Sequence, residues 1–181
     1  MHFKLAFTFS RFAYKYGPKI AHFQNKQACA MFLGTALRDQ RALIENADRG
    51  TFMTVYESVE RLLEIKALTL WTAKKFDIST SEKSQTEILR NIVDACNEEG
   101  LGAGRDIERT LSWADDFFAR PEVRKIFDEA RVEIALPKSP WELPKTVKSM
   151  GQLITQEAQR VHQILKIAKN KPGNDNTPKP R

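Results

Sequence analysis

Apolar side chains recur every three or four residues along most of this chain, which is the spacing of one face of an α-helix. Residues 52–74 show it most clearly, with apolar positions at Phe52, Val55, Val59, Leu62, Leu63, Leu70 and Trp71. Residues 20–47 follow the same rule up to a turn at Asp48-Arg49-Gly50, after which Thr51 can cap the next helix. The pattern therefore predicts two long antiparallel helices in the first half of the chain.

The rest of the chain adds further amphipathic segments. Residues 3–16 fit either a strand or a helix, and a helix is favoured because the sequence has no second strand-like run to pair with them. Later helices are expected at residues 81–96, capped by Thr80 or Ser81, at 106–118, capped by Asp106, at 121–134, starting at Pro121, and at 145–170. These segments predict an all-α bundle of six to seven helices.

Three segments interrupt this pattern. The glycine-rich run Gly100-Leu101-Gly102-Ala103-Gly104 is the natural point of subdivision within a helical domain of residues 1–169. Residues 136–144 form a Pro-rich loop that we expect to be irregular, with Trp141 covering apolar helix surface. Residues 170–181 have no apolar side chain other than proline, which predicts a disordered basic C-terminal tail.

The composition of the 181 residues is that of a globular protein, with 41% hydrophobic and 29% charged residues. Cys29 and Cys96 lie in apolar helical patterns far apart in the chain, which favours buried thiols in a reducing compartment. The longest apolar runs fall well short of the about 18 residues that a membrane span needs. We therefore expect a cytoplasmic protein with no membrane span. Arg11 and Lys15 interrupt the N-terminal apolar run, which argues against a signal peptide and leaves an organellar transit peptide as the alternative.

The formal net charge of +6 is concentrated at the two ends of the chain. Residues 1–50 carry eight basic and three acidic residues, and residues 151–181 carry six and two. Residues 51–100 carry six basic and nine acidic residues. If the terminal helices are neighbours, their charges form one positive face suited to nucleic acid, anionic lipid or an acidic protein.

The basic ends supply the candidate site. Near the N-terminus, basic residues interleave with Phe12, Tyr14 and Tyr16, as in grooves that hold phosphates and stack bases. Lys166 and Lys169 are i, i+3 neighbours on the last expected helix. The candidate nucleic-acid contacts are Arg11, Lys15, Lys19, Lys166, Lys169 and Lys171. The alternative is that the aromatic rings belong to the core and leave a solvated basic edge.

Familiar catalytic and metal-binding patterns do not occur in the sequence. His2, His22 and His162 lie far apart and none belongs to an HExxH motif, so we expect neither a metal nor a cofactor. The glycine-rich run lacks the preceding strand and the following Lys-Ser/Thr of a nucleotide-binding loop. Arg160 and His162 are two residues apart, which places them about 200° apart around a helix rather than on one face.

These observations favour a non-enzymatic accessory or regulatory protein that acts by binding, with electrostatic contact to nucleic acid as its expected activity. The first alternative is a protein-binding adaptor, or a subunit of a larger assembly, that uses exposed apolar helix surface. The second is an enzyme whose site is assembled from scattered residues. Salt separates the first two classes, because phosphate contacts weaken steeply with salt whereas adaptor docking responds mainly to apolar substitutions.

Overall fold

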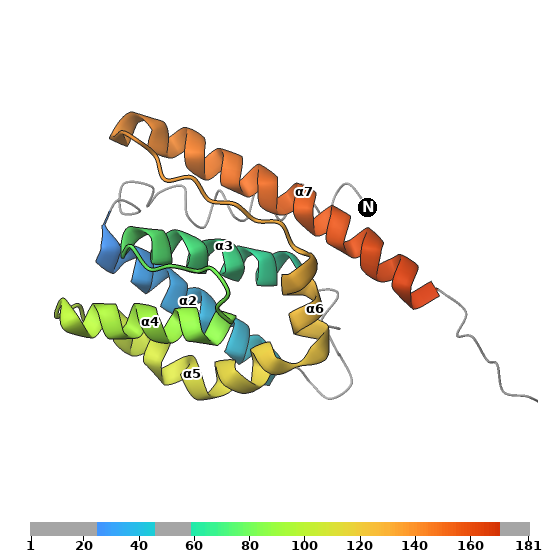
Figure 1. The fold of residues 1–181 in the computed structure, drawn as a ribbon, viewed down its shortest axis with the longest axis horizontal. Helices are drawn as coiled ribbons and strands as arrows, with labels where there is room; N and C mark the ends of the chain where they lie inside the picture. The colour runs from blue at the N-terminus through green and yellow to red at the C-terminus, as the bar shows by residue number, and fades with distance from the viewer. Residues whose placement is uncertain (1–24, 46–58, 171–181) are drawn as a thin grey trace, which may run out of the picture.

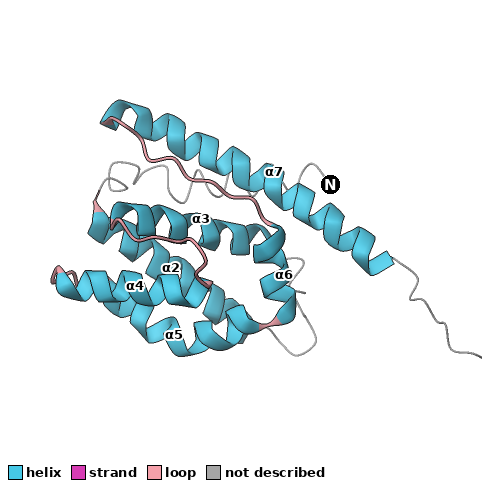
Figure 2. Cartoon of the chain, in the orientation of Figure 1, coloured by secondary structure: helices cyan, strands magenta, loops and turns pink. Residues whose placement is uncertain are grey.

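The described part of the chain is helical throughout. The computed structural model describes residues 25–45 and 59–170, with side chains up to residue 167. These residues form six α-helices, one short 3₁₀-helix and no β-strand (Figure 2). In chain order they are α2 (Lys26–Glu45), α3 (Val59–Lys75), α4 (Gln85–Glu98), α5 (Gly104–Ala119), α6 (Pro121–Glu129), η3 (Pro140–Glu142) and α7 (Leu143–Asn170). This confirms the predicted all-α bundle.

Four of the helices form a closed ring of contacts, in which α2 packs on α3 and α5, and α4 packs on the same two helices. The helices α2 and α3 run antiparallel, as their spacing predicted (Figure 1). The short α6 bridges α5 and α3, and α7 packs against α3 as an outer layer (Figure 1). The C-terminal part of α7 extends past the rest of the bundle. This arrangement leaves one long side of α7 facing away from the bundle.

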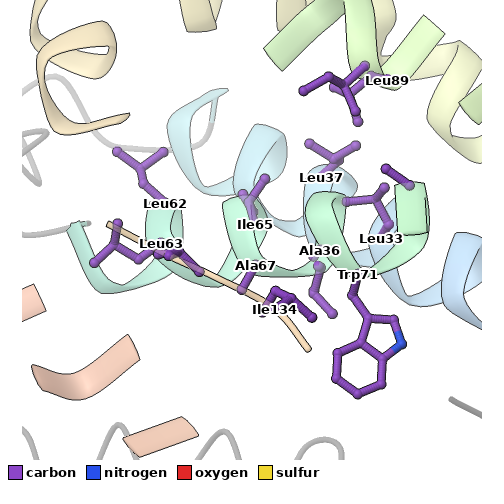
Figure 3. Close-up of a cluster of buried hydrophobic side chains, with 14 of the residues drawn as sticks. Leu33, Ala36, Leu37, Leu62, Leu63, Ile65, Ala67, Trp71, Leu89 and Ile134 are labelled. Carbon is purple, nitrogen blue, oxygen red and sulfur yellow. The ribbon is translucent and has the colours of Figure 1, made fainter. Parts of the chain in front are cut away.

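The core is built around α3, as Figure 3 shows. Leu63 and Trp71 of α3 are almost fully buried, together with Leu37 of α2 and Leu89 of α4. Ile134, which follows α6, contributes to the same cluster (Figure 3). The apolar stripes that define the helices in the sequence are therefore the surfaces that the bundle buries. Cys29 and Cys96 are buried thiols that form no disulfide, and their burial agrees with the apolar surroundings that predicted it.

The start of α4 differs from the prediction. Neither Thr80 nor Ser81 caps this helix; Ser84 does, in a complete capping box with Glu87. The Glu87 backbone N–H donates to the Ser84 hydroxyl over 3.2 Å, and the Ser84 N–H donates to the Glu87 carboxylate over 2.9 Å. The reciprocal pair requires Glu three residues after the cap, which Ser84 has and neither Thr80 nor Ser81 has.

A tight turn joins α4 to α5. Gly100 has φ +69°, and the Leu101 N–H donates to the Cys96 carbonyl over 2.8 Å, which ends α4 in a Schellman-type motif. A Cβ at Gly104 would lie 2.8 Å from the Cys96 Cβ, so glycine lets the two helices approach. The start of α5 at Gly104 also corrects the expected Asp106 cap, because Asp106 lies inside the helix. A domain subdivision at this run stays a prediction.

The end of α6 is a second difference, because the helix expected to reach residue 134 stops at Glu129. Ala130, Val132 and Ile134 are buried while Arg131 and Glu133 are exposed, so the chain continues in an extended form with every second side chain inward. This segment runs alongside α3 and α7 (Figure 1). After Glu129, burial of every second side chain replaces the three- to four-residue spacing that a helix would have.

The Pro-rich loop is the third difference. Part of it is regular, because Pro140–Glu142 forms η3 and leads directly into α7, with Pro144 in the first turn. Trp141 does not cover a helix, since it is 87% exposed. Leu143 is buried instead. Two residues apart in a helical turn face roughly opposite directions, so only one of the two side chains can reach the bundle.

Several predictions concern residues outside the described ranges and stay predictions. They are the helix at 3–16, the turn at 48–50 with the Thr51 cap, and the basic tail from residue 171. The helix expected at 20–47 is described from Lys26 to Glu45, and the helix expected at 52–74 from Val59 to Lys75.

Candidate nucleic-acid interface

The helix α7 is attached to the bundle by one apolar side. The buried residues of this side recur every three or four positions over the length of the helix: Leu143, Val147, Met150, Ile154, Ala158, Val161 and Leu165. They belong to the same hydrophobic cluster as the buried residues of α3, on which α7 packs. Burial of this stripe fixes how α7 is rotated about its axis, and thereby which side chains point to solvent.

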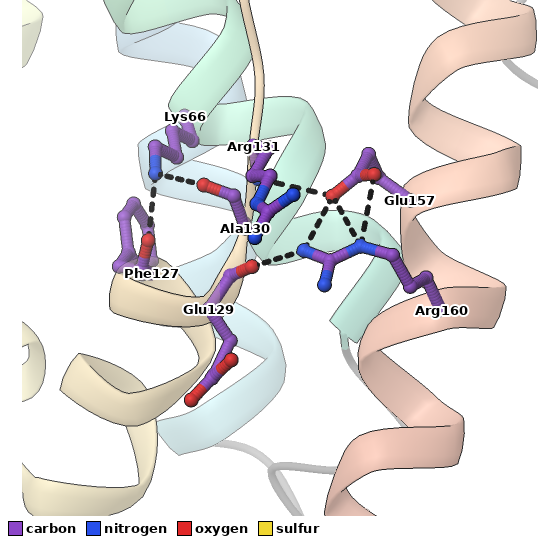
Figure 4. A network of polar contacts seen from close by, with 7 residues as sticks. All are labelled: Lys66, Phe127, Glu129, Ala130, Arg131, Glu157 and Arg160. Carbon is purple, nitrogen blue, oxygen red and sulfur yellow. Dashed lines mark hydrogen bonds and ion pairs between the residues drawn. The ribbon is translucent and has the colours of Figure 1, made fainter.

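A polar network fixes α7 to the end of α6 (Figure 4). The Arg160 guanidinium donates to the Glu129 carbonyl, and it also contacts the Glu157 carboxylate, with Nη2 to Oε2 at 3.0 Å. The same carboxylate accepts the Arg131 backbone N–H over 3.0 Å. From α3, the Lys66 ammonium donates to the carbonyls of Phe127 at 2.6 Å and of Ala130 at 2.9 Å. Two cations therefore satisfy backbone carbonyls that α6 leaves open where it ends.

The charges in this network are shifted by their surroundings. The hydrogen bonds from Arg160 lower the pKa of Glu157 below its usual value and outweigh burial, which raises it. Burial lowers the pKa of Lys66, and the nearby carboxylates of Asp128 and Glu157 partly oppose that shift. Since the Glu157 side chain is 13% exposed and engaged with Arg160, it presents little negative charge to solvent. Arg160, which the sequence did not place on one face with His162, thus has a structural role.

The opposite side of α7 carries a continuous polar surface, which we call the outer stripe. Its residues are all exposed and recur every three or four positions: Lys145, Lys148, Gln152, Gln156, Gln159, Gln163 and Lys166. At 100° per residue they fall within an arc of about 80°, centred opposite the buried side. The outer stripe contains no carboxylate, and within the described residues none of its three lysines takes part in an ion pair.

The distribution of charge sets α7 apart from the rest of the bundle. The helix has five basic residues and Glu157 alone as acid, which gives a formal charge of +4. The other described residues, 25–45 and 59–142, contain sixteen basic and nineteen acidic residues, for a formal charge of −3. There, exposed cations pair with carboxylates, as in Lys26 with Glu99 at 2.9 Å and Arg90 with Asp115 at 2.5 Å. Within residues 25–45 and 59–170, positive charge is therefore concentrated on α7.

The structure places only part of the predicted site. Lys166 is exposed on the outer stripe, and Lys169 belongs to the last turn of α7, where side chains are not described. Arg11, Lys15, Lys19 and Lys171 lie outside the described residues. Whether the two chain ends join into one positive face stays a prediction.

Sequence reasoning missed the N-terminal half of the outer stripe. Lys145 and Lys148 were counted in a segment with no net charge, because residues 101–150 hold nine basic and nine acidic residues. The absence of acid from the outer face of the expected helix at 145–170 was the signal that could have revealed them. That face contains four glutamines, Gln152, Gln156, Gln159 and Gln163, and no Asp or Glu.

Other chemistry finds little support in the described residues. No three His, Cys, Asp or Glu side chains among them gather closely enough to hold a metal ion. Burial raises the pKa of the Cys29 thiol to about 11, which keeps it protonated and unreactive at neutral pH. A shallow depression on α6 is lined by charges of both signs, including Arg124, Lys125 and Asp128.

None of the helices in residues 25–45 and 59–170 combines the length and the apolarity that crossing a membrane requires. Comparison with protein-family models, with curated proteins and with solved structures finds no match to this chain.

Proposed function

We propose that this protein is a non-enzymatic accessory protein that binds nucleic acid by electrostatic contact through the outer stripe of α7. The observation that carries the proposal is a helix face with three exposed lysines and no carboxylate, whose lysines form no ion pair among the described residues, while the other described residues are slightly acidic. Phosphates are the ligands that such a face attracts, because each contact releases condensed counterions.

The dimensions of the outer stripe suit a nucleic-acid backbone. At 1.5 Å per residue, Lys145 and Lys166 lie about 32 Å apart along the helix axis. A duplex carries one phosphate per strand for about every 3.4 Å of its axis, so the stripe matches the length of roughly nine base pairs. The lysines at its two ends supply charge, and the glutamines between them supply amide donors and acceptors for phosphates, sugars and base edges.

An anionic membrane fits this face less well. A helix that lies in a membrane surface inserts a broad apolar side between the headgroups. The apolar side of α7 is buried on α3, and the outer stripe offers glutamines in its place. The charge complementarity of the face therefore favours nucleic acid.

The adaptor alternative needs an exposed apolar surface. The large apolar side chains that are exposed in the described residues are Met31, Leu43, Trp141 and Ile167, and they come from three different elements. These four side chains are spread over three elements and give no reason to prefer an adaptor to the nucleic-acid proposal. The adaptor stays an alternative.

The test compares two variants of the full chain that lose the same charge. In the first, the three lysines of the outer stripe are replaced: Lys145→Gln, Lys148→Gln and Lys166→Gln. In the control, three exposed lysines on other elements are replaced: Lys74→Gln, Lys83→Gln and Lys125→Gln. Affinity for a duplex longer than the stripe is measured by fluorescence anisotropy between about 50 and 200 mM salt.

The wild-type protein should show a linear fall of log affinity with log salt. The outer-stripe variant should reduce the slope by about 2 to 3, because each lost phosphate contact removes roughly 0.9. The control variant should keep the wild-type slope. Equal slopes for the two variants, or no binding of the wild-type protein to either a duplex or a single strand at about 50 mM salt, would contradict the proposal.

A further inference from the structure

Trp141 is the most exposed large apolar side chain of the described residues, at 87%. The other two tryptophans differ, because Trp71 is 1% exposed in the core and Trp113 is half-buried, stacked on Phe117 with ring centroids 4.7 Å apart. The indole of Trp141 thus presents both faces to solvent beside a basic surface.

The position of Trp141 is set by the backbone of η3. Pro140–Glu142 winds directly into α7, so the helical register continues across the junction. At about 120° per residue in η3 and about 100° per residue in α7, Lys145 lies roughly 80° and Lys148 roughly 20° from Trp141 around the axis. Trp141 therefore continues the outer stripe at its N-terminal end, next to two exposed lysines. Lys138, just before η3, is exposed as well.

We propose that Trp141 stacks on an unpaired base while Lys145 and Lys148 hold the neighbouring phosphates, so that the protein prefers single-stranded to double-stranded nucleic acid. This inference rests on the proposed function and adds the class of nucleic acid. In a duplex the faces of the bases are stacked on one another, and an indole cannot reach them without opening the helix. In a single strand every base offers an aromatic face, so the contact tolerates any sequence.

The surroundings of Trp141 distinguish this role from anchoring in a membrane. A tryptophan at a membrane surface works together with neighbouring apolar side chains that enter the lipid. The exposed residues nearest Trp141 along this face are polar, with Glu142 directly after it and Lys145 and Lys148 about one and two turns further on. Aromatic rings interleaved with cations are typical of proteins that follow a single strand.

The test uses the full chain and two probes of the same mixed sequence, a single-stranded DNA oligonucleotide and its duplex, with an RNA strand as a third probe. Trp141→Ala should weaken single-strand binding by roughly 5- to 150-fold and leave duplex binding unchanged. Trp141→Phe should retain most of the single-strand affinity, because a stackable ring remains. Ile167→Ala, which removes an exposed apolar side chain at the other end of α7, should change neither.

Intrinsic fluorescence gives a second measurement. Stacking on a base should quench the emission of Trp141, so a saturating single strand should reduce the fluorescence of the wild-type protein and not that of Trp141→Phe. Circular dichroism checks that each variant keeps its helix content.

The outcomes separate the two proposals. If Trp141→Ala binds single strand as tightly as the wild-type protein, or loses single-strand and duplex affinity equally, the stacking inference is overturned while the outer-stripe proposal stands. If no nucleic acid binds the wild-type protein, both are overturned. Loss of binding to phosphatidylserine vesicles in Trp141→Ala, with nucleic-acid binding unchanged, would also overturn the inference in favour of a membrane contact.

Discussion

Replacing Lys66 with methionine tests the junction that ends α6 and holds α7. The change removes the ammonium and keeps most of the aliphatic stem, so packing in the core is largely preserved. The carbonyls of Phe127 and Ala130, at 2.6 and 2.9 Å from Nζ, each lose a charged donor. Hydrogen bonds to charged groups contribute roughly 1.5–3 kcal/mol each.

Relief of desolvation offsets part of this loss, because burial of the ammonium has a cost that is visible in the lowered pKa of Lys66. We therefore expect Lys66→Met to reduce the free energy of unfolding by about 2–4 kcal/mol. Urea unfolding followed by circular dichroism measures this, with exposed Lys83→Met as the control for loss of one charge. A loss of less than about 0.5 kcal/mol, the range of ordinary surface substitutions, would refute the role assigned to Lys66.

Lys66 also makes the free energy of unfolding depend on pH. Its pKa is lower in the folded chain than in the unfolded chain, so over the window between the two values the unfolded state binds more protons. Lys66 should therefore contribute a rise in the stability of the wild-type protein as pH increases through that window toward about 10.4, the ordinary value for lysine, against the fall that the raised pKa of Cys29 and Cys96 gives both proteins. The Lys66→Met variant should lack this rise, which urea unfolding at a series of alkaline pH values will show.

Three further results are expected. Glu157→Gln should cost about 1–3 kcal/mol at neutral pH, and because the folded pKa of Glu157 is lowered, urea titrations should show this difference shrinking as pH falls below about 4.3. Because Glu157→Gln removes the acidic residue of α7, the variant should bind nucleic acid at least as well as the wild-type protein, which fluorescence anisotropy can check. Cys29 and Cys96, buried with raised pKa, should resist thiol labelling until denaturant is added. Leu63→Ala and Ile92→Ala should each cost about 2–5 kcal/mol in urea unfolding, because both side chains are fully buried, whereas surface-like costs would contradict the packing.

The sequence by itself determined which segments are helices and which of their sides are apolar. The helix expected at 145–170 is observed at Leu143–Asn170, and α6 begins at Pro121 as predicted. Both depend on local properties, namely the period of the apolar positions and the fixed φ of proline. Burial of Cys29 and Cys96 follows from the same local pattern.

Tertiary structure decided where the chain leaves helical form and which exposed residues form a surface. The helix α6 ends at Glu129, where Lys66 and Arg160, 61 to 64 and 31 residues distant in sequence from the carbonyls they reach, satisfy its last turn. Packing of α7 on α3 leaves Leu143 buried and Trp141 in solvent. Both side chains are apolar, so the sequence alone does not determine which of them is buried. A helix has an outer face only when another surface covers its inner face. Lys145 and Lys148 lie in a segment with no net charge, and they become part of the outer stripe only because packing on α3 fixes the rotation of α7.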